Sequence, residues 1–211
     1  MSRRVRSMTV PSSSAGAWNI PPIMGPPAPR LGSTPYASQG NSTTAFWRHN
    51  VVLNTWTALA PTPTVPDDGA SLAFTGGDFI YATRGGNFTE FWRYSILGNS
   101  WLATLAPTPA GIGHGAGLAF TGGDFIYATR GGNFTEFWRY SISGNSWLSM
   151  APTPSSVGVG ASLAFAGGDF IYATGGGLGI AFWRYGILTN LWEPRANTPA
   201  AVFVGGTLAA G

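Results

Sequence analysis

The stretch GGDFIYAT at residues 76–83 decides the fold, because it recurs unchanged at 122–129 and at 167–174. A fixed period of this kind is typical of a repeat architecture. A Phe-Trp-Arg pattern and a second tryptophan follow each copy, and both also occur once before the first copy. The first tryptophan series is Trp47, Trp92, Trp138 and Trp183, and the second is Trp56, Trp101, Trp147 and Trp192. Both series have spacings of 45, 46 and 45 residues, so the chain contains four repeats.

One period predicts four short strands. In the second repeat these are residues 70–75, 78–84, 90–96 and a stretch around Trp101. The Gly-Gly dipeptide at 76–77 favours a hairpin turn between the first two strands. Prolines at 107 and 109 end the fourth strand, because proline cannot donate to a strand ladder. Four antiparallel strands in a period of 40–50 residues indicate one blade of a β-propeller.

The same residues resemble the kelch repeat. That motif has a Gly-Gly pair after its second strand, a tyrosine in the third and a tryptophan seven residues later. The matching positions are Gly85-Gly86, Tyr94 and Trp101; Gly131-Gly132, Tyr140 and Trp147; and Gly176-Gly177, Tyr185 and Trp192. The first repeat departs from the motif, with His49 at the tyrosine position. The resemblance covers about residues 31–211 and implies a propeller, but kelch propellers serve many roles, so it implies no particular function.

The ends of the chain predict how the propeller closes. The first repeat starts at its second strand, near Leu31, whereas residues 205–210 read as a surplus first strand. We therefore expect a four-bladed kelch-like β-propeller over residues 31–211, closed by insertion of the C-terminal strand into the first blade. Its repeats span about 31–75, 76–121, 122–166 and 167–211. Closure through a second chain is the alternative.

Charge is distributed unevenly along the chain. Only 9% of residues are charged; residues 1–30 hold four arginines and no acid, whereas the rest is nearly neutral. A surface so poor in charge suggests that partner subunits cover much of it. Residues 1–30 predict an extended, basic, Pro/Ser-rich arm that docks on another subunit, and three clustered arginines are a weak nucleic-acid signal. The expected contact residues of the arm are Arg3, Arg4, Arg6, Trp18, Ile20 and Ile23.

The strand order brings two kinds of loop to one face of the propeller. The ligand-binding candidates on this loop face are Asp67, Asp68, Asn87, Phe88, His114, Asn133 and Phe134. Exposed phenylalanines at equivalent blade positions would grip a partner or a sugar. The alternative, which we favour, is that Phe88 and Phe134 tuck between blades, because large apolar side chains are usually covered.

Repeated polar and aromatic residues are better explained by structure than by catalysis. The aspartates after Gly-Gly (Asp78, Asp124, Asp169) suit turn bonding, and the strand arginines (Arg48, Arg93, Arg139, Arg184) suit aromatic or carboxylate contacts. A structural role is also expected for Tyr94, Trp101, Tyr140, Trp147, Tyr185 and Trp192. The sequence has no metal-ligand spacing, and we expect no cofactor. Kelch-type oxidases need a cysteine-linked tyrosine, and this chain has no cysteine.

These features together predict a non-enzymatic structural or adaptor subunit that binds other protein subunits, with homo-oligomers among the expected assemblies. A phage virion tail or neck component, or a surface appendage, fits a compact propeller with a basic arm. A glycan-binding propeller that uses the aromatic loops is the alternative function. No signal peptide or membrane-spanning segment is expected, which leaves the localisation open and compatible with a virion.

Overall fold

The computed structural model describes residues 34–40, 42–102 and 104–210. Throughout this part the chain forms strands, turns and loops, and none of it is helical. The strands make four antiparallel sheets, so the prediction of an all-β fold is confirmed. Accordingly, no helix in the described residues is able to span a membrane. The predicted arm, residues 1–30, lies outside the described residues.

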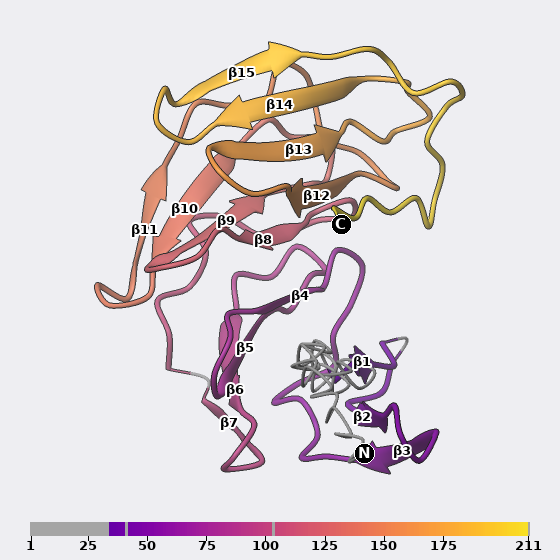
Figure 1. Ribbon diagram of the computed structural model, residues 1–211, viewed down its shortest axis with the longest axis vertical. Coiled ribbons are helices and arrows are strands. Elements are labelled where there is room, and N and C mark those ends of the chain that lie inside the picture. The colour runs from indigo at the N-terminus through magenta and orange to yellow at the C-terminus, as the bar shows by residue number, and fades with distance from the viewer. Residues whose placement is uncertain (1–33, 41, 103, 211) are drawn as a thin grey trace, which may run out of the picture. The chain divides into compact units, whose positions relative to one another are not determined.

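Each sheet takes its strands from one stretch of the chain, and each strand pairs with its neighbours in sequence (Figure 1). The first sheet contains β1 (Tyr36–Ser38), β2 (Phe46–Asn50) and β3 (Thr55–Ala58). The second contains β4 (Ser71–Phe74), β5 (Phe79–Thr83), β6 (Phe91–Ser95) and β7 (Ser100–Leu102). The third contains β8 (Leu118–Phe120), β9 (Phe125–Thr129), β10 (Phe137–Ser141) and β11 (Ser146–Ser149). The fourth contains β12 (Ser162–Phe165), β13 (Phe170–Thr174), β14 (Phe182–Gly186) and β15 (Leu191–Pro194).

The repeated residues explain these strands directly. Between β4 and β5, Gly76 and Gly77 have φ angles of 80° and 59°, which side chains disfavour and glycine adopts readily. Between β6 and β7 the turn contains Asn99 at φ 44°, a conformation that asparagine tolerates. The middle strands β5 and β6 are mostly buried, whereas the outer strand β7 is mostly exposed. The third and fourth sheets repeat this pattern of a buried centre and an outer edge in solvent.

The first sheet differs from the other three, because it has three strands and begins at β1. The strand predicted to complete it is not formed: residues 205–210 contain no strand, and β1 pairs only with β2. A strand forms only where it can hydrogen-bond to the edge of a neighbouring strand. No hydrogen bond joins the described C-terminal residues to the first sheet. Val202 instead exchanges backbone hydrogen bonds with Leu178 and Gly179, in a loop of the fourth sheet. The structure therefore does not show the predicted closure by the C-terminal strand.

The inner strands of the second, third and fourth sheets pack together. β8 packs against both β4 and β12. The three strands share the Leu-Ala-Phe sequence, and the small alanine at its centre is buried in each of them. A cavity of about 280 Å³ lies along these strands, and Leu208 and Ala210 from the C-terminal segment also line it. The C-terminal segment therefore runs beside the inner strands without pairing.

Candidate functional site

An aromatic junction joins each sheet to the next and is the best-defined repeated contact. Between the second and third sheets, the Phe91 ring meets the Tyr140 ring at 4.8 Å and the Trp147 ring at 4.9 Å, edge to face. Tyr81 stacks on Phe91 at 5.6 Å. Phe91, Tyr140 and Tyr81 are each only 1% exposed, so the junction forms part of the core. The same arrangement joins the first sheet to the second through Phe46, Tyr94 and Trp101, and the third to the fourth through Phe137, Tyr185 and Trp192.

Hydrogen bonds to one alanine peptide complete each junction. Trp147 Nε1 donates to the Ala106 carbonyl at 3.0 Å, and the Ala106 N–H donates to Asn145 Oδ1 at 2.8 Å. The Tyr140 hydroxyl donates to the same Asn145 oxygen at 2.7 Å. The other two junctions repeat these bonds with Ala60, Asn99 and Trp101 and with Ala151, Asn190 and Trp192. Each of the first three sheets therefore presents an alanine peptide that an asparagine and a tryptophan of the next sheet bind.

Burial keeps the junction tyrosines in their neutral, hydrogen-bonding form. It raises the pKa of Tyr140 to about 12 and also raises the pKa of Tyr94 and Tyr185. Burial likewise raises the pKa of Tyr127, and the Tyr127 hydroxyl has no hydrogen-bond partner among the described residues. A fully buried hydroxyl in such surroundings is a structural element of the core, and it does not reach solvent to act as an acid or base.

One half of the junction stays uncovered on the first sheet. Trp56 occupies the position of Trp101 and Trp147, but it is 57% exposed, because no described sheet precedes it. His49 takes the tyrosine position, its ring 4.9 Å from Trp56, and its Nε2 lies 3.3 Å from Asn54 Oδ1. An apolar cavity of about 310 Å³ lies between Trp56, Trp47 and Ala37. This face carries the largest exposed aromatic side chain of the described residues.

The other half of the junction stays uncovered on the fourth sheet. Tyr172 stacks on Phe182 at 5.6 Å, as Tyr81 does on Phe91. No aromatic ring of a following sheet meets this pair among the described residues, so both rings remain partly exposed. Ala196 stands at the position of the three bound alanines, and it is exposed. The first and fourth sheets therefore each present one half of a contact that the chain forms three times internally.

On the loop face, Phe88 and Phe134 are neither fully exposed nor tucked between sheets. Phe88 is 43% exposed, and its backbone pairs with Ile112 of the next sheet's entry loop. The Arg84 guanidinium lies over its ring at 3.4 Å from the centroid, a cation–π contact. Phe134 repeats this arrangement, with 44% exposure and Arg130 at 3.5 Å. One ring face is thus covered by arginine, and the predicted burial between blades is only partial.

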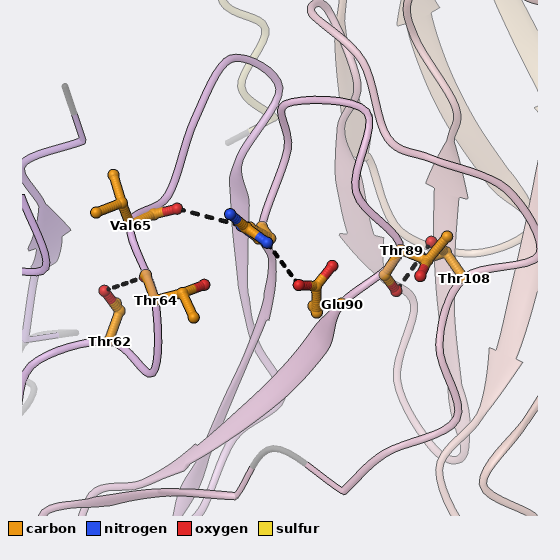
Figure 2. A network of polar contacts seen from close by, with 7 residues as sticks. Thr62, Thr64, Val65, Thr89, Glu90 and Thr108 are labelled. Atoms are coloured by element: carbon orange, nitrogen blue, oxygen red, sulfur yellow. Dashed lines mark hydrogen bonds and ion pairs between the residues drawn. The ribbon is translucent and has the colours of Figure 1, made fainter. Parts of the chain in front are cut away.

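The Arg84 side chain makes polar contacts with Val65 and Glu90, both of which are labelled in Figure 2. It pairs with Glu90 at 2.6 Å and donates from Nε to the Val65 carbonyl at 3.4 Å. The Thr62 hydroxyl donates to the Thr64 carbonyl at 2.9 Å in the same region. Arg130 pairs with Glu136 at 2.5 Å in the third sheet. The charges of Arg84, Glu90, Arg130 and Glu136 are therefore paired within the loops.

The other loop-face candidates take up separate places. Asp67 and Asp68 are exposed, and Asp67 Oδ1 accepts the N–H of Asp68 at 2.8 Å. The His114 carbonyl accepts a backbone hydrogen bond at 2.8 Å from Gly132. Asn87 and Asn133 adopt φ angles of 62° and 65° and shape the turns before the phenylalanines. No three histidine, cysteine, aspartate or glutamate side chains gather to form a metal site anywhere in the described residues.

The repeated aspartates lie in the turn before the second strand of their sheets, and the repeated arginines lie on the third strand. Asp78 accepts from the Leu97 N–H at 2.6 Å and from the Ser95 hydroxyl at 2.7 Å, and these bonds, Leu97 first, lower its pKa. The Arg93 guanidinium lies 4.3 Å above the Phe79 ring. Equivalent contacts involve Asp124, Asp169, Arg139 and Arg184. Within each of these sheets the aspartate holds the turn that follows the third strand.

Sequence reasoning missed two parts of this site. The arginine caps on Phe88 and Phe134 were not anticipated, although Arg84 and Arg130 precede the Gly-Gly pair at equivalent positions. The role of the turn asparagines was also missed, although Asn54, Asn99, Asn145 and Asn190 recur with the period of the repeat. The arm residues Arg3, Arg4, Arg6, Trp18, Ile20 and Ile23 lie outside the described residues.

Comparisons with known proteins agree on the fold alone. No protein-family model and no curated protein matches the sequence. Among solved structures 199 chains match, and one of them is described as the structure of YjhT, with a TM-score of 0.64 and 18% sequence identity. The match covers 80% of this chain but 64% of that chain, so this chain spans less than two thirds of its length. The similarity supports a β-propeller-like fold.

Proposed function

We propose that this protein is a non-enzymatic structural or adaptor subunit that binds other protein subunits through the uncovered first sheet. The observation that carries this proposal is the exposure of the Trp56 side chain. The equivalent tryptophans Trp101, Trp147 and Trp192 bind the preceding sheet, whereas Trp56 is 57% exposed beside an apolar cavity. Covering such a side chain with protein is favourable, and tryptophan is enriched among the residues that dominate interface energies.

The sheets are proposed to be blades of a kelch-type propeller. Support comes from the Gly-Gly pairs in tight turns and from the tyrosine and tryptophan of the last three repeats, which meet at the junctions. The proposed setting is a phage virion tail or neck, or a surface appendage. The low share of charged residues, 9%, supports such a setting, because much of a subunit's surface is covered there. The arm, residues 1–30, is proposed as a second point of attachment.

Light scattering during size-exclusion chromatography tests this proposal. The wild-type chain is expected to elute with a mass above that of one chain, and Trp56→Ser is expected to shift it toward the monomer. Leu97→Ser is the matched control, because Leu97 is 89% exposed and belongs to no junction. A chain without residues 1–30 separates the contribution of the arm. A wild-type mass of one chain that neither change alters would contradict association through this face.

A glycan-binding propeller remains the second candidate, because Phe88 and Phe134 are about equally exposed at equivalent positions. Each ring has one face covered by arginine, so a sugar would stack on the other face. A Phe88→Ala/Phe134→Ala double variant is expected to fold and to lose any signal on a glycan array. The absence of a wild-type signal across a broad array would remove this candidate.

A further inference from the structure

We propose that two copies of this chain join head to tail, with the first sheet of one copy packed on the fourth sheet of the other. The inference rests on the proposed function and names the partner of the uncovered face. Its basis is that the two uncovered faces are the two halves of a junction formed three times within the chain. A head-to-tail contact between copies closes into a ring where the rotation allows it.

The aromatic groups of the two faces match the internal junctions. The fourth sheet presents Tyr172 stacked on Phe182, with ring centroids 5.6 Å apart. In the preceding junction the corresponding Phe137 is met by a tyrosine and a tryptophan of the next sheet. The first sheet presents His49 and Trp56 at these two positions, with ring centroids 4.9 Å apart. Packed together, the four rings rebuild the junction, with histidine in place of tyrosine.

The hydrogen-bonding groups match as well. In every internal junction an alanine peptide after the outer strand binds a tryptophan and an asparagine of the next sheet. On the fourth sheet this alanine is Ala196, which is exposed. On the first sheet the two partners are Trp56 and Asn54, and Asn54 has φ 52°, close to the 54° of Asn190. In the pair of copies, Trp56 Nε1 donates to the Ala196 carbonyl, and Asn54 Oδ1 accepts the Ala196 N–H.

The C-terminal segment follows the path of a further inner strand. Gly115 lies so close to the Gly158 carbonyl that an added Cβ would be 1.8 Å from its oxygen, and Gly160 lies equally close to the Phe203 carbonyl, at 1.9 Å. The chain after β15 thus repeats the path of the chain after β11. Leu208 then reaches the cavity beside the inner strands. The first sheet lacks an inner strand, so residues 205–210 pair with β1 of the other copy.

A second copy suits these faces better than the chain's own opposite end. Among the described residues, no hydrogen bond or aromatic contact joins the first sheet to the fourth. Two copies supply eight sheets, within the range of about four to eight blades known for propellers.

Engineered cysteines test the contact directly, because the chain has none of its own. The test pair is Asn54→Cys on one chain and Ala196→Cys on another, mixed under mild oxidation. The control is Ala60→Cys/Asn99→Cys within one chain, where the same two positions are joined by a hydrogen bond of 2.9 Å. Both pairs place a cysteine at a positive φ, so they share any cost of that substitution. We expect a crosslinked dimer from the mixture and neither single variant to crosslink alone.

The outcomes separate the inference from the proposed function. If the control pair crosslinks but the mixture does not, the second-copy contact is wrong. If a doubly substituted Asn54→Cys/Ala196→Cys chain crosslinks only within itself, as a monomer, the faces close inside one chain and the inference is also overturned. In either case, an assembly that Trp56→Ser still dissociates keeps the proposed function with a different partner.

Light scattering gives a second, independent measurement. Trp56→Ser is expected to weaken the dimer by about tenfold or more, the effect of losing one central interface tryptophan. Deleting residues 1–30 is expected to leave dimerisation intact. A dimer that is lost on this deletion but unchanged by Trp56→Ser would show that the arm makes the contact, and would overturn the inference.

Discussion

Replacing Trp147 by alanine should lower the free energy of unfolding by about 3 kcal/mol, the lower end of the range for emptying a large aromatic site. The side chain packs edge to face on Phe91 at 4.9 Å and beside Tyr140 at 5.0 Å, and such pairs contribute about 0.5–1.5 kcal/mol each. Its indole N–H donates to Ala106 at 3.0 Å, which adds about 1 kcal/mol. The lower end applies because Trp147 is partly exposed.

Urea denaturation followed by circular dichroism measures this change, with linear extrapolation to water. Trp147→Phe is the matched variant: it keeps an aromatic ring against Phe91 but loses the donor, so the expected loss is smaller, about 1 kcal/mol. Trp56→Ala, at concentrations where the chain is monomeric, should cost less than about 1 kcal/mol, because that side chain is 57% exposed. Equal losses at Trp147 and Trp56 would refute the junction as the source of the stability.

Three further outcomes are expected. Removing residues 201–211 should lower the free energy of unfolding by about 2 kcal/mol, because Val202 makes two backbone hydrogen bonds to the fourth sheet. The same deletion should abolish dimerisation, and an unchanged urea midpoint and an unchanged mass in solution would contradict these two expectations. The hydrogen bond from the Ser141 hydroxyl is the main cause of the lowered pKa of Asp124, so the ionised Asp124 contributes to stability above the unfolded pKa of 3.8, and this contribution is lost as pH falls further. In a pH series of denaturation curves, Asp124→Asn should therefore reduce the loss of stability at acid pH. Burial raises the pKa of Tyr140 to about 12, so the neutral hydroxyl stabilises the fold fully below pH 10, and this contribution to stability should disappear as pH rises from 10 to about 12. An ultraviolet titration that shows Tyr140 ionising at pH 10 in the folded chain would be contrary evidence.

The repeat predicted most of the local structure, because its turns and strands depend on residues close together in the chain. The Gly-Gly pair at 76–77 adopts the positive φ angles that a hairpin needs, and 78–84 contains the observed β5. The period also predicted a first sheet that starts at the position of a second strand, which is where β1 lies. The candidate loop residues were chosen by strand order alone, and this placed Phe88 correctly on a loop without revealing the arginine above it.

By itself, then, the sequence determined an all-β chain of four repeats, because strand alternation, tight turns and period are local properties. Only the tertiary structure decided which repeated side chains have a partner. Trp56 and Trp147 occupy the same place in the repeat, yet one is exposed and the other binds Ala106, because only the second has a preceding sheet beside it. The same reason separates the C-terminal segment from β12: residues 205–210 follow an inner-strand path but lack a strand edge with which to pair. A repeat specifies its own fold, whereas burial and pairing depend on what lies next to it in space.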